Sequence, residues 1–337
     1  MTSAEIRSAV ESQGWACGFC SIGRLAALQE DARRMAPGGV DPEVMRERLG
    51  FYEFQPPASL PGAHSLIVAA VPLPSARVRF TWNGAVVEVM VPPAYVGYEA
   101  AGRRVQAFLQ GLLTPLGRRL ETVRLPEKLL AARVGLAFYG RNNLAYVPGM
   151  GSYLRLATFY TDLELSEDRW REPRELPRCQ SCGACRKTCP TGAIPADRFL
   201  LRAERCLVFH NERPSGIPFP AWIPAGAHGC LVGCLKCQAP CPENVHRLGW
   251  IEDAGEFTEE ETSCLLEGRP LESLDARLRA KLDAADLTPV HGMLARNLRM
   301  LSTDGSPAAR PSRRRSRFCP SFVHLKSLFR RGTRGNI

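Results

Sequence analysis

Four closely spaced cysteines, followed by a proline, constrain this chain more than any other feature. Cys179, Cys182, Cys185 and Cys189 follow the spacing C-x2-C-x2-C-x3-C, and Pro190 comes next. This run is typical of bacterial proteins that hold 4Fe–4S clusters. In such proteins three of the thiolates bind one cluster and the fourth binds a different cluster. The pattern therefore predicts two clusters and requires further cysteine ligands elsewhere in the chain.

A second set of cysteines provides these ligands. Cys234, Cys237 and Cys241 follow C-x2-C-x3-C with Pro242 next, and Cys206 lies between the two sets. Because the cysteine before each proline binds the other cluster, the two sets are predicted to exchange one ligand. The predicted ligands are Cys179, Cys182, Cys185 and Cys241 for the first cluster, and Cys189, Cys206, Cys234 and Cys237 for the second.

The cysteines also allow interpretations other than two clusters. Two structural zinc sites are the alternative, but zinc sites use pairs of C-x2–4-C and need neither a third cysteine three residues on nor the Cys-Pro endings. Cys230 is the alternative ligand to Cys234, which we favour because C-x2-C makes the tighter loop. Cys17 and Cys20 have no partner pair nearby in sequence, so they are predicted to be buried small hydrophobic residues.

Composition limits where such a protein works. The longest apolar stretch, residues 66–71, is far shorter than the roughly 18–20 residues of a membrane-spanning helix. The N-terminus lacks the apolar core of a signal peptide. A cytoplasmic protein whose 13 cysteines serve metal or redox chemistry is therefore expected, with no membrane partner. Residues 306–337 hold nine of the basic residues and no acidic ones; a disordered, solvated tail is predicted, with attraction to phosphate backbones as the alternative.

The residues before the cysteines are predicted to form an α/β domain, residues 1–170, that holds a cofactor or substrate. Residues 65–71 and 153–160 are predicted as strands, and Asn83-Gly84 between two β-prone runs predicts a hairpin. The predicted helices of this domain span residues 2–13, 98–120 and 126–137.

Three further regions complete the predicted α+β chain. Residues 171–250 begin with a linker and hold all the predicted ligands, so they are expected to be a ferredoxin-like double-cluster domain. Residues 251–304 have polar helical periodicity and are predicted to be a small helical cap. Residues 305–337 are the basic tail.

Two clusters in one small domain make an electron relay rather than a catalyst, because each cluster passes one electron at a time. A simple carrier has no need of a large preceding domain, which favours an oxidoreductase whose N-terminal domain holds the electron consumer. The chain has no G-x-G-x-x-G after a strand, no P-loop and no C-x-x-C-H motif that would identify this consumer.

Several short motifs flank the cysteines, and together they resemble a known family. They are Ala131-Ala132-Arg133, Gly140-Arg141-Asn142-Asn143, Pro190-Thr191-Gly192 and Cys241-Pro242-Glu243-Asn244. In order and spacing these segments resemble the epoxyqueuosine reductase family. The resemblance implies a nitroreductase-like N-terminal domain that binds a cobalamin, with a two-cluster domain that passes electrons to cobalt from a low-potential donor such as ferredoxin or flavodoxin. The family reaction removes the epoxide oxygen from epoxyqueuosine in the anticodon loop of tRNA, giving queuosine.

The same resemblance implies roles for five residues. The family's catalytic acid is an Asp in an Asp-x-x-Pro element before the Ala-Ala-Arg helix. Counting back without gaps places Glu121 there as the proton donor, without the proline. Arg141, Asn142, Asn143 and Ser152 are the predicted cofactor-binding residues. The alternatives are a solvated carboxylate for Glu121 and a simple turn for residues 141–143.

Three other functions stay open at this point. The altered acid element is compatible with a reductase of the same build that uses another acceptor, such as a small organic molecule or the cobalt of a partner protein. A two-cluster electron carrier without catalysis is the second alternative. A zinc-stabilised RNA-binding module that uses the basic tail is the third, and the cysteine spacing argues against it.

Overall fold

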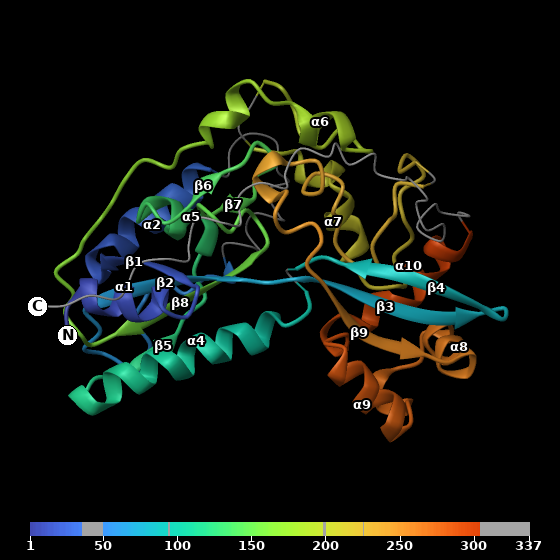
Figure 1. The fold of residues 1–337 in the computed structure, drawn as a ribbon, viewed down its shortest axis with the longest axis horizontal. Coiled ribbons are helices and arrows are strands. Elements are labelled where there is room, and N and C mark those ends of the chain that lie inside the picture. The colour runs from blue at the N-terminus through green and yellow to red at the C-terminus, as the bar shows by residue number, and fades with distance from the viewer. Residues whose placement is uncertain (36–49, 94, 198–199, 225, 304–337) are drawn as a thin grey trace, which may run out of the picture.

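The computed structural model of the protein describes residues 1–35, 50–93, 95–197, 200–224 and 226–303. Two main sheets organise it, and Figure 1 shows them side by side with the cysteine region across the top. The basic tail lies outside the described residues, so its disorder stays a prediction. Within the described ranges, no helix has the length and apolar character needed to cross a membrane.

The first sheet is antiparallel and has the strand order β1-β2-β8-β5. Its strands span Ala16–Ser21 (β1), Ser65–Pro72 (β2), Leu120–Thr122 (β5) and Leu154–Thr161 (β8). β2 and β8 are buried along almost their whole length. Burial on both faces explains why β2 is a nearly continuous apolar run. The strands predicted over 65–71 and 153–160 are confirmed.

Helices cover both faces of this sheet. They span Ser3–Glu11 (α1), Leu25–Arg34 (α2), Tyr98–Leu113 (α4) and Glu127–Arg133 (α5). α1 and α4 enclose one apolar core with Phe19 and Phe159 of the strands. α2 and α5 enclose a second core with Leu66 and Tyr160. The N-terminal region therefore has three layers, with the sheet in the middle, as expected of an α/β domain.

Two of the predicted helices end earlier than their periodicity indicates. The helix predicted over 98–120 ends at Leu113, and Gly117, with a φ of 69°, then turns the chain toward β5. The helix predicted over 126–137 ends at Arg133. Apolar residues that continue the periodicity beyond these ends belong to turns and strands, which periodicity alone does not separate from a helix.

The predicted hairpin forms part of the second sheet. Strands β3 (Ser75–Trp82) and β4 (Ala85–Val91) are antiparallel, and Trp82 pairs with Ala85. Asn83 and Gly84 have φ values of 50° and 71°, the left-handed backbone that a two-residue hairpin turn requires. The hairpin prediction is therefore confirmed.

The region predicted to be a helical cap also contributes a strand. β9 (Ile251–Phe257) pairs with β3 in parallel, which corrects the purely helical prediction for residues 251–304. β9 is an edge strand in which three of the seven residues are acidic and four are exposed, so it carries no apolar alternation that would reveal it. Helices α8 (Glu259–Glu267), α9 (Ala276–Ala284) and α10 (His291–Thr303) complete this region.

One core joins the hairpin to the C-terminal helices. Phe80 of β3 and Phe257 of β9 stack with their ring centroids 5.0 Å apart. Leu265, Leu282 and Leu294 of the helices pack in the same cluster. The hairpin, predicted inside the domain of residues 1–170, thus packs with residues that follow the cysteine region.

In the described part of the cysteine region, the helical segments are all short. They are Pro177–Gln180 (η3), Ala184–Thr188 (α6), Ala203–Arg205 (η4), Leu207–Asn211 (α7) and Pro242–Asn244 (η5). Helices this short have little stability of their own. What surrounds the cysteines therefore decides how this region is held.

Candidate functional site

The first predicted ligand set is brought together across the length of the cysteine region. Burial raises the pKa of Cys185, and the negative charges of Cys179, Cys241 and Cys182 raise it further. Burial likewise raises the pKa of Cys179, and Cys241 adds to the effect. Arg178, the residue before Cys179, pairs through its Nε with Glu243 Oε1 at 3.0 Å, so the segment that holds Cys241 lies beside the start of the first cysteine run.

The second predicted set is brought together in the same way. Burial raises the pKa of Cys234 to about 11, and the charges of Cys206 and Cys189 contribute. Burial also raises the pKa of Cys237, with contributions from Cys234, Cys206 and Cys185. The last contribution shows that the two groups adjoin each other. The assignment of each thiolate to one of the two clusters stays a prediction.

The predicted donor sets consist of thiolates, the ligand type of 4Fe–4S clusters. Across the residues that the structure describes, no three His, Cys, Asp or Glu side chains converge closely enough to hold one metal ion. A 4Fe–4S cluster binds each of its four thiolates through a different iron, so it spreads its ligands more widely than one ion does. Four neighbouring thiolates in each group are the donor set that such a cluster requires.

Three of the other cysteines, Cys230, Cys17 and Cys20, lie outside the two predicted ligand sets and are buried. Cys230 is 6% exposed; burial raises its pKa to about 12, and the charge of Cys234 adds to the effect. Cys234 in turn neighbours Cys206 and Cys189, which favours Cys234 as the ligand. Cys17 and Cys20 lie on β1 with 6% and 1% exposure, so the prediction that they are buried is confirmed.

A tight turn of the N-terminal region faces both cysteine groups. Strands β6 (Phe138–Tyr139) and β7 (Ala145–Tyr146) form a short antiparallel pair, and residues 140–144 connect them. The Gly140 N–H donates to the Leu144 carbonyl oxygen at 2.8 Å. A Cβ atom on Gly140 would collide with the Tyr146 ring, so this close approach requires glycine.

Two of the predicted cofactor-binding residues in this turn bind protein groups instead. The Arg141 guanidinium donates from Nε and Nη2 to the two Glu175 carboxylate oxygens, both at 3.0 Å. Asn142 is 4% exposed, and its Nδ2 donates to Tyr146 Oη at 3.0 Å. These contacts clamp the turn onto the linker that leads into Cys179.

Ser152 also forms hydrogen bonds to other protein groups. Its backbone N–H donates to Asn244 Oδ1 at 2.8 Å, and its hydroxyl donates to Gln238 Oε1 at 3.0 Å. Asn244 is fully buried, and its Nδ2 donates to the Gln238 carbonyl oxygen at 2.9 Å. Ser152 therefore ties the N-terminal region to the end of the cysteine region.

Among the predicted cofactor-binding residues, Asn143 has a side-chain amide that is not engaged by the protein. Its side-chain Nδ2 is buried and has no hydrogen-bond partner. Its backbone has a φ of 61°, and its carbonyl oxygen accepts a hydrogen bond from Lys128 Nζ at 3.1 Å. A buried amide donor without a partner is costly, which makes this nitrogen a candidate contact for a bound group.

Glu121, the predicted proton donor, lies on the short edge strand β5, opposite Tyr160 of β8. Figure 1 shows β5 next to α4 at the lower left, far from α6 and the cysteine region. The structure therefore does not bring Glu121 to the cysteine groups.

A different carboxyl, which sequence reasoning missed, is better placed. Glu127 begins α5, and Arg155 Nη1 donates to its Oε2 at 2.6 Å. The Arg155 guanidinium lies over the Tyr98 ring, 3.7 Å from its centroid. Burial raises the pKa of Glu127 to about 7, although Arg155 and Tyr98 lower it. A carboxyl in this range exchanges protons near neutral pH.

The first turn of α5 adjoins the second cysteine group. Lys128 follows Glu127, and its Nζ donates to the Asn143 carbonyl oxygen at 3.1 Å, in the same turn from which Asn142 Nδ2 donates to the Cys237 carbonyl oxygen at 3.5 Å. The only sequence signal at this position was a Pro126-Glu127 helix start. That signal does not reveal Arg155, which comes from β8 and is brought to Glu127 by the fold.

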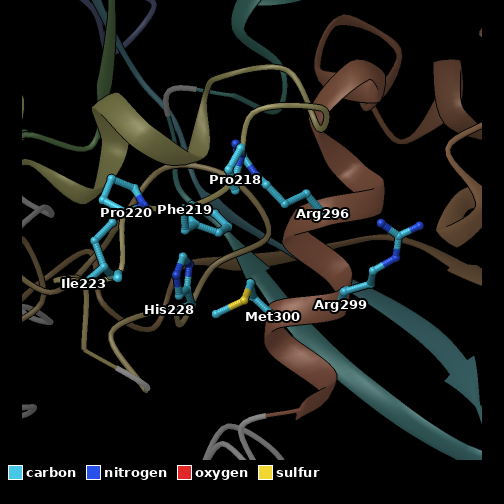
Figure 2. A pocket seen from close by; sticks show the side chains of 9 residues that line it. Pro218, Phe219, Pro220, Ile223, His228, Arg296, Arg299 and Met300 are labelled. Carbon is cyan, nitrogen blue, oxygen red and sulfur yellow. The ribbon is translucent and has the colours of Figure 1, made fainter.

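A cavity of about 400 Å³ lies elsewhere, between the 218–228 loop and α10 (Figure 2). Phe219, His228 and Met300 line it together with Arg296. The Arg296 guanidinium is occupied, because it donates to the Ile217 and His210 carbonyl oxygens at 2.6 and 2.9 Å. The lining includes none of the predicted site residues, so this cavity is separate from the cysteine site.

Comparison with protein families agrees with the cysteine analysis. Residues 178–244 match the family described as the 4Fe-4S double cluster binding domain. The prediction of a double-cluster domain in this part of the chain is therefore confirmed.

The curated relatives are epoxyqueuosine reductases. One from Gloeobacter violaceus is 26% identical over 259 residues, which cover 72% of this chain and 77% of the relative. One from Synechococcus sp. is 33% identical over 129 residues, which cover 38% of this chain and 37% of the relative. The match thus spans little more than a third of that second relative's length.

Solved structures agree with this fold. Epoxyqueuosine reductase from Bacillus subtilis aligns with a TM-score of 0.61 at 21% identity, over 88% of this chain and 80% of that one. The enzyme from Streptococcus thermophilus aligns over the same shares with a TM-score of 0.60 at 20% identity. At such identities the likeness establishes the fold, and with the sequence matches it confirms the resemblance predicted from the motifs.

Proposed function

We propose that this chain, which resembles the epoxyqueuosine reductases in sequence and in fold, is an iron–sulfur reductase that removes the epoxide oxygen of epoxyqueuosine in tRNA. The observation that carries the proposal is the interleaving of the two cysteine groups. Cys241 lies beside Cys179 and Cys185, and Cys189 lies beside Cys234. Two adjoining clusters next to an α/β domain form a one-electron relay with a site for the acceptor. The proposed substrate is the one named in the relatives, which are epoxyqueuosine reductases.

The proposed reaction is balanced by two electrons and two protons. Both carbon–oxygen bonds of the epoxide break, a carbon–carbon double bond forms, and the oxygen leaves as water. The electrons enter singly from a low-potential donor such as ferredoxin or flavodoxin and pass through the two clusters. The protons must come from side chains or water near the substrate.

We assign the proton for the departing oxygen to Glu127 in place of Glu121. Glu127 lies at the start of α5, next to Lys128 and the second cysteine group. Its pKa of about 7 lets the carboxyl hold a proton at neutral pH and release it. Arg155 then stabilises the carboxylate that remains after the proton has left.

The family resemblance also implies a cobalamin in the N-terminal region. Asn143 fits such a group because its buried amide nitrogen has no partner. Arg141, Asn142 and Ser152 do not fit it in this conformation, because their side chains bind Glu175, Tyr146 and Gln238. When bound, a corrinoid would supply a cobalt centre that accepts single electrons.

The first experiment determines the composition of the protein. The chain is purified and reconstituted with iron and sulfide without oxygen, mixed with cobalamin, and passed through a gel-filtration column. We expect about eight irons per chain, retained cobalamin with a shifted visible spectrum, and conversion of epoxyqueuosine-containing tRNA to the queuosine form. Zinc in place of iron and sulfide would contradict the proposal.

Other outcomes identify the alternative functions. Eight irons and bound cobalamin without turnover would indicate a reductase with a different acceptor. Eight irons with neither cobalamin nor turnover would indicate an electron carrier.

Two matched substitutions test the proton donor. Glu127→Gln is expected to lower the rate of turnover by about 10²-fold or more, which is typical of a lost general acid, and to remove a pH dependence near 7. Glu121→Gln is expected to leave the rate close to that of the unmodified protein. The reverse pattern would assign the proton to Glu121.

A further inference from the structure

The charged side chains of the two cysteine loops are all positive. Residues 179–196 and 230–242 contain Arg186, Lys187 and Lys236 but no Asp or Glu. All three basic side chains are exposed. The two loops hold seven of the eight predicted cluster ligands. Positive charge therefore gathers at the surface of the part of the chain through which electrons are expected to pass.

The structure brings these three charges together on one surface. Thr188, the last residue of α6, donates from Oγ1 to the Lys236 carbonyl oxygen at 2.7 Å. The stem of Lys236 passes Gly229, where an added Cβ atom would lie 3.6 Å from Lys236 Cε. Lys236 thus lies beside the helix that carries Arg186 and Lys187. We call these three basic residues the α6 face.

The cations of the α6 face have no acidic partner, unlike other cations near the cysteines. Arg141 pairs with Glu175, and Arg178 pairs with Glu243, each at 3.0 Å. Among the residues that the structure describes, no acidic side chain lies within ion-pair distance of the three α6-face cations. Figure 1 shows α6 along the top of the molecule, away from both sheets. The charges of this face are therefore available to a partner molecule.

We propose that the α6 face docks the protein that delivers electrons to the relay, a small one-electron carrier with an acidic surface. The inference rests on the electron relay of the proposed function and adds its point of entry. One electron leaves the reduced carrier and enters a cluster, so the carrier is oxidised and this chain is reduced by one electron each. No bond forms or breaks. Opposite charges speed the encounter of such partners without requiring a large or permanent interface.

The position of the α6 face favours a carrier protein over tRNA, which is also anionic. Electron transfer requires close approach to a cluster, and Arg186 directly follows Cys185 while Lys236 directly precedes Cys237. The N-terminal region, where the substrate is proposed to bind, meets the cysteine region through other groups, such as Asn142 Nδ2, which donates to the Cys237 carbonyl oxygen at 3.5 Å. It leaves the α6 face exposed.

The test measures electron transfer from an acidic flavodoxin to the reconstituted full-length protein. Reduced flavodoxin is mixed with the oxidised protein in a stopped-flow instrument, and the flavin absorbance reports its oxidation. A triple variant with Arg186→Glu, Lys187→Glu and Lys236→Glu is expected to lower the second-order rate constant by about tenfold or more at low salt. The difference is expected to shrink as salt is added, because salt screens exposed charges.

A matched control changes the net charge by the same amount elsewhere. Arg103→Glu and Arg104→Glu on α4, combined with Arg277→Glu on α9, reverse three exposed cations far from α6. This variant is expected to keep a rate close to that of the unmodified protein. Lys187→Glu alone, two residues from the nearest cysteine, keeps the test available where the triple variant fails to hold iron. It is expected to show a smaller loss with the same salt dependence.

Two further measurements exclude other roles of the same charges. The midpoint potentials of the clusters are expected to stay the same in the α6-face variants, because exposed charges are screened by solvent. Affinity for the tRNA substrate is also expected to stay the same. A rate loss that persists at high salt or accompanies shifted potentials would overturn the inference, since the charges would then act on the clusters. Lost tRNA affinity with an unchanged flavodoxin rate would overturn it in favour of an RNA contact.

The results separate this inference from the proposed function. Equal flavodoxin rates in the α6-face variants, the control and the unmodified protein would overturn the inference, while turnover of epoxyqueuosine with a chemical reductant would leave the function intact. An unmodified protein that binds no iron would overturn both. A flavodoxin rate that depends on the α6 face, without turnover of epoxyqueuosine, would support the inference and count against the substrate.

Discussion

The first sheet and the cysteine region are held together by different forces. β2 and β8 pair over eight residues, and both faces of their sheet carry apolar cores. The cysteine region has helices of at most five residues, and most of its described side chains are partly or fully exposed. Burial of apolar surface is sufficient to hold the sheet. The cysteine region has little buried apolar surface, so we expect its structure to depend on bound iron and on polar contacts with its neighbours.

Removal of iron is the strongest way to test this difference. When a chelator strips the reconstituted protein, we expect residues 178–244 to lose most of their protection from hydrogen exchange, while β2 and β8 keep theirs. Hydrogen exchange read by mass spectrometry measures both regions in one sample. Cys264→Ser, which changes a cysteine outside the predicted ligand sets, is the control and is expected to keep its iron. Unchanged protection of 178–244 would show that packing alone holds the region.

A core substitution tests the opposite side of the comparison. Phe159 is 1% exposed in the centre of β8. Phe159→Ala is expected to lower the free energy of unfolding of the first sheet by about 3–5 kcal/mol, since it removes buried apolar surface and leaves a cavity. Urea unfolding followed by far-ultraviolet circular dichroism gives the value. Val86→Ala, at a side chain that is 54% exposed, is the control; a similar loss there would show that the effect is not one of burial.

The partly buried carboxyl of Glu127 predicts a pH dependence of stability. Its pKa rises from 4.5 in the unfolded chain to about 7 in the folded one. The folded state therefore holds this proton more tightly, so the stabilising contribution is complete below about pH 4.5 and is lost as the pH rises through 7. The full loss is about 3 kcal/mol.

Glu127→Gln is expected to remove this dependence. Relative to the unmodified protein, the variant should gain unfolding free energy between pH 5 and pH 8, as measured by denaturant titration of iron-loaded samples. Glu11→Gln makes the same change from carboxyl to amide at an exposed position, and it is the control. Equal pH dependence in the Glu127 variant and the unmodified protein would mean that Arg155 keeps the carboxyl ionised.

The smallest expected effect concerns the joint between the two regions. Ser152→Ala removes the hydroxyl that donates to Gln238 Oε1 and accepts from Asn244 Nδ2, both at 3.0 Å, while Asn244 Oδ1 still accepts from the Ser152 backbone N–H. A loss of about 1 kcal/mol in unfolding free energy is expected, together with faster hydrogen exchange around Asn244. Ser8→Ala on the exposed side of α1 is the control. If exchange around Asn244 did not change, the joint would not depend on this hydroxyl.

The double-cluster domain was predictable because its sequence signal is local. The spacing of Cys179, Cys182 and Cys185 within one short loop predicts three ligands without knowledge of the fold. The Asn83-Gly84 hairpin was predictable for the same reason, because its backbone conformation depends on those two residues. The burial of Cys17 and Cys20 also follows from their place in an apolar strand.

The rest of the site was not predictable, because it depends on contacts between distant segments. Glu127 looks like an ordinary residue at the start of a helix until β8 brings Arg155 against it. Arg141 and Asn142 were interpreted as cofactor contacts, and only the position of Glu175 and Tyr146 shows what they bind. Such partners come from elements that are distant in the chain. A single sequence does not indicate which distant elements will pack against each other.

The sequence by itself determined the two cysteine sets, the double-cluster domain and the main strands of the first sheet. These features depend on local spacing and on apolar patterning, which a chain carries wherever it folds. The tertiary structure decided that β9 completes the sheet of a hairpin far away in sequence. It also decided that Asn142 of the β6–β7 turn meets the Cys237 carbonyl oxygen and that Arg155 of β8 meets Glu127 of α5. Those outcomes depend on burial and on charge at short range, which exist only once distant segments are packed together.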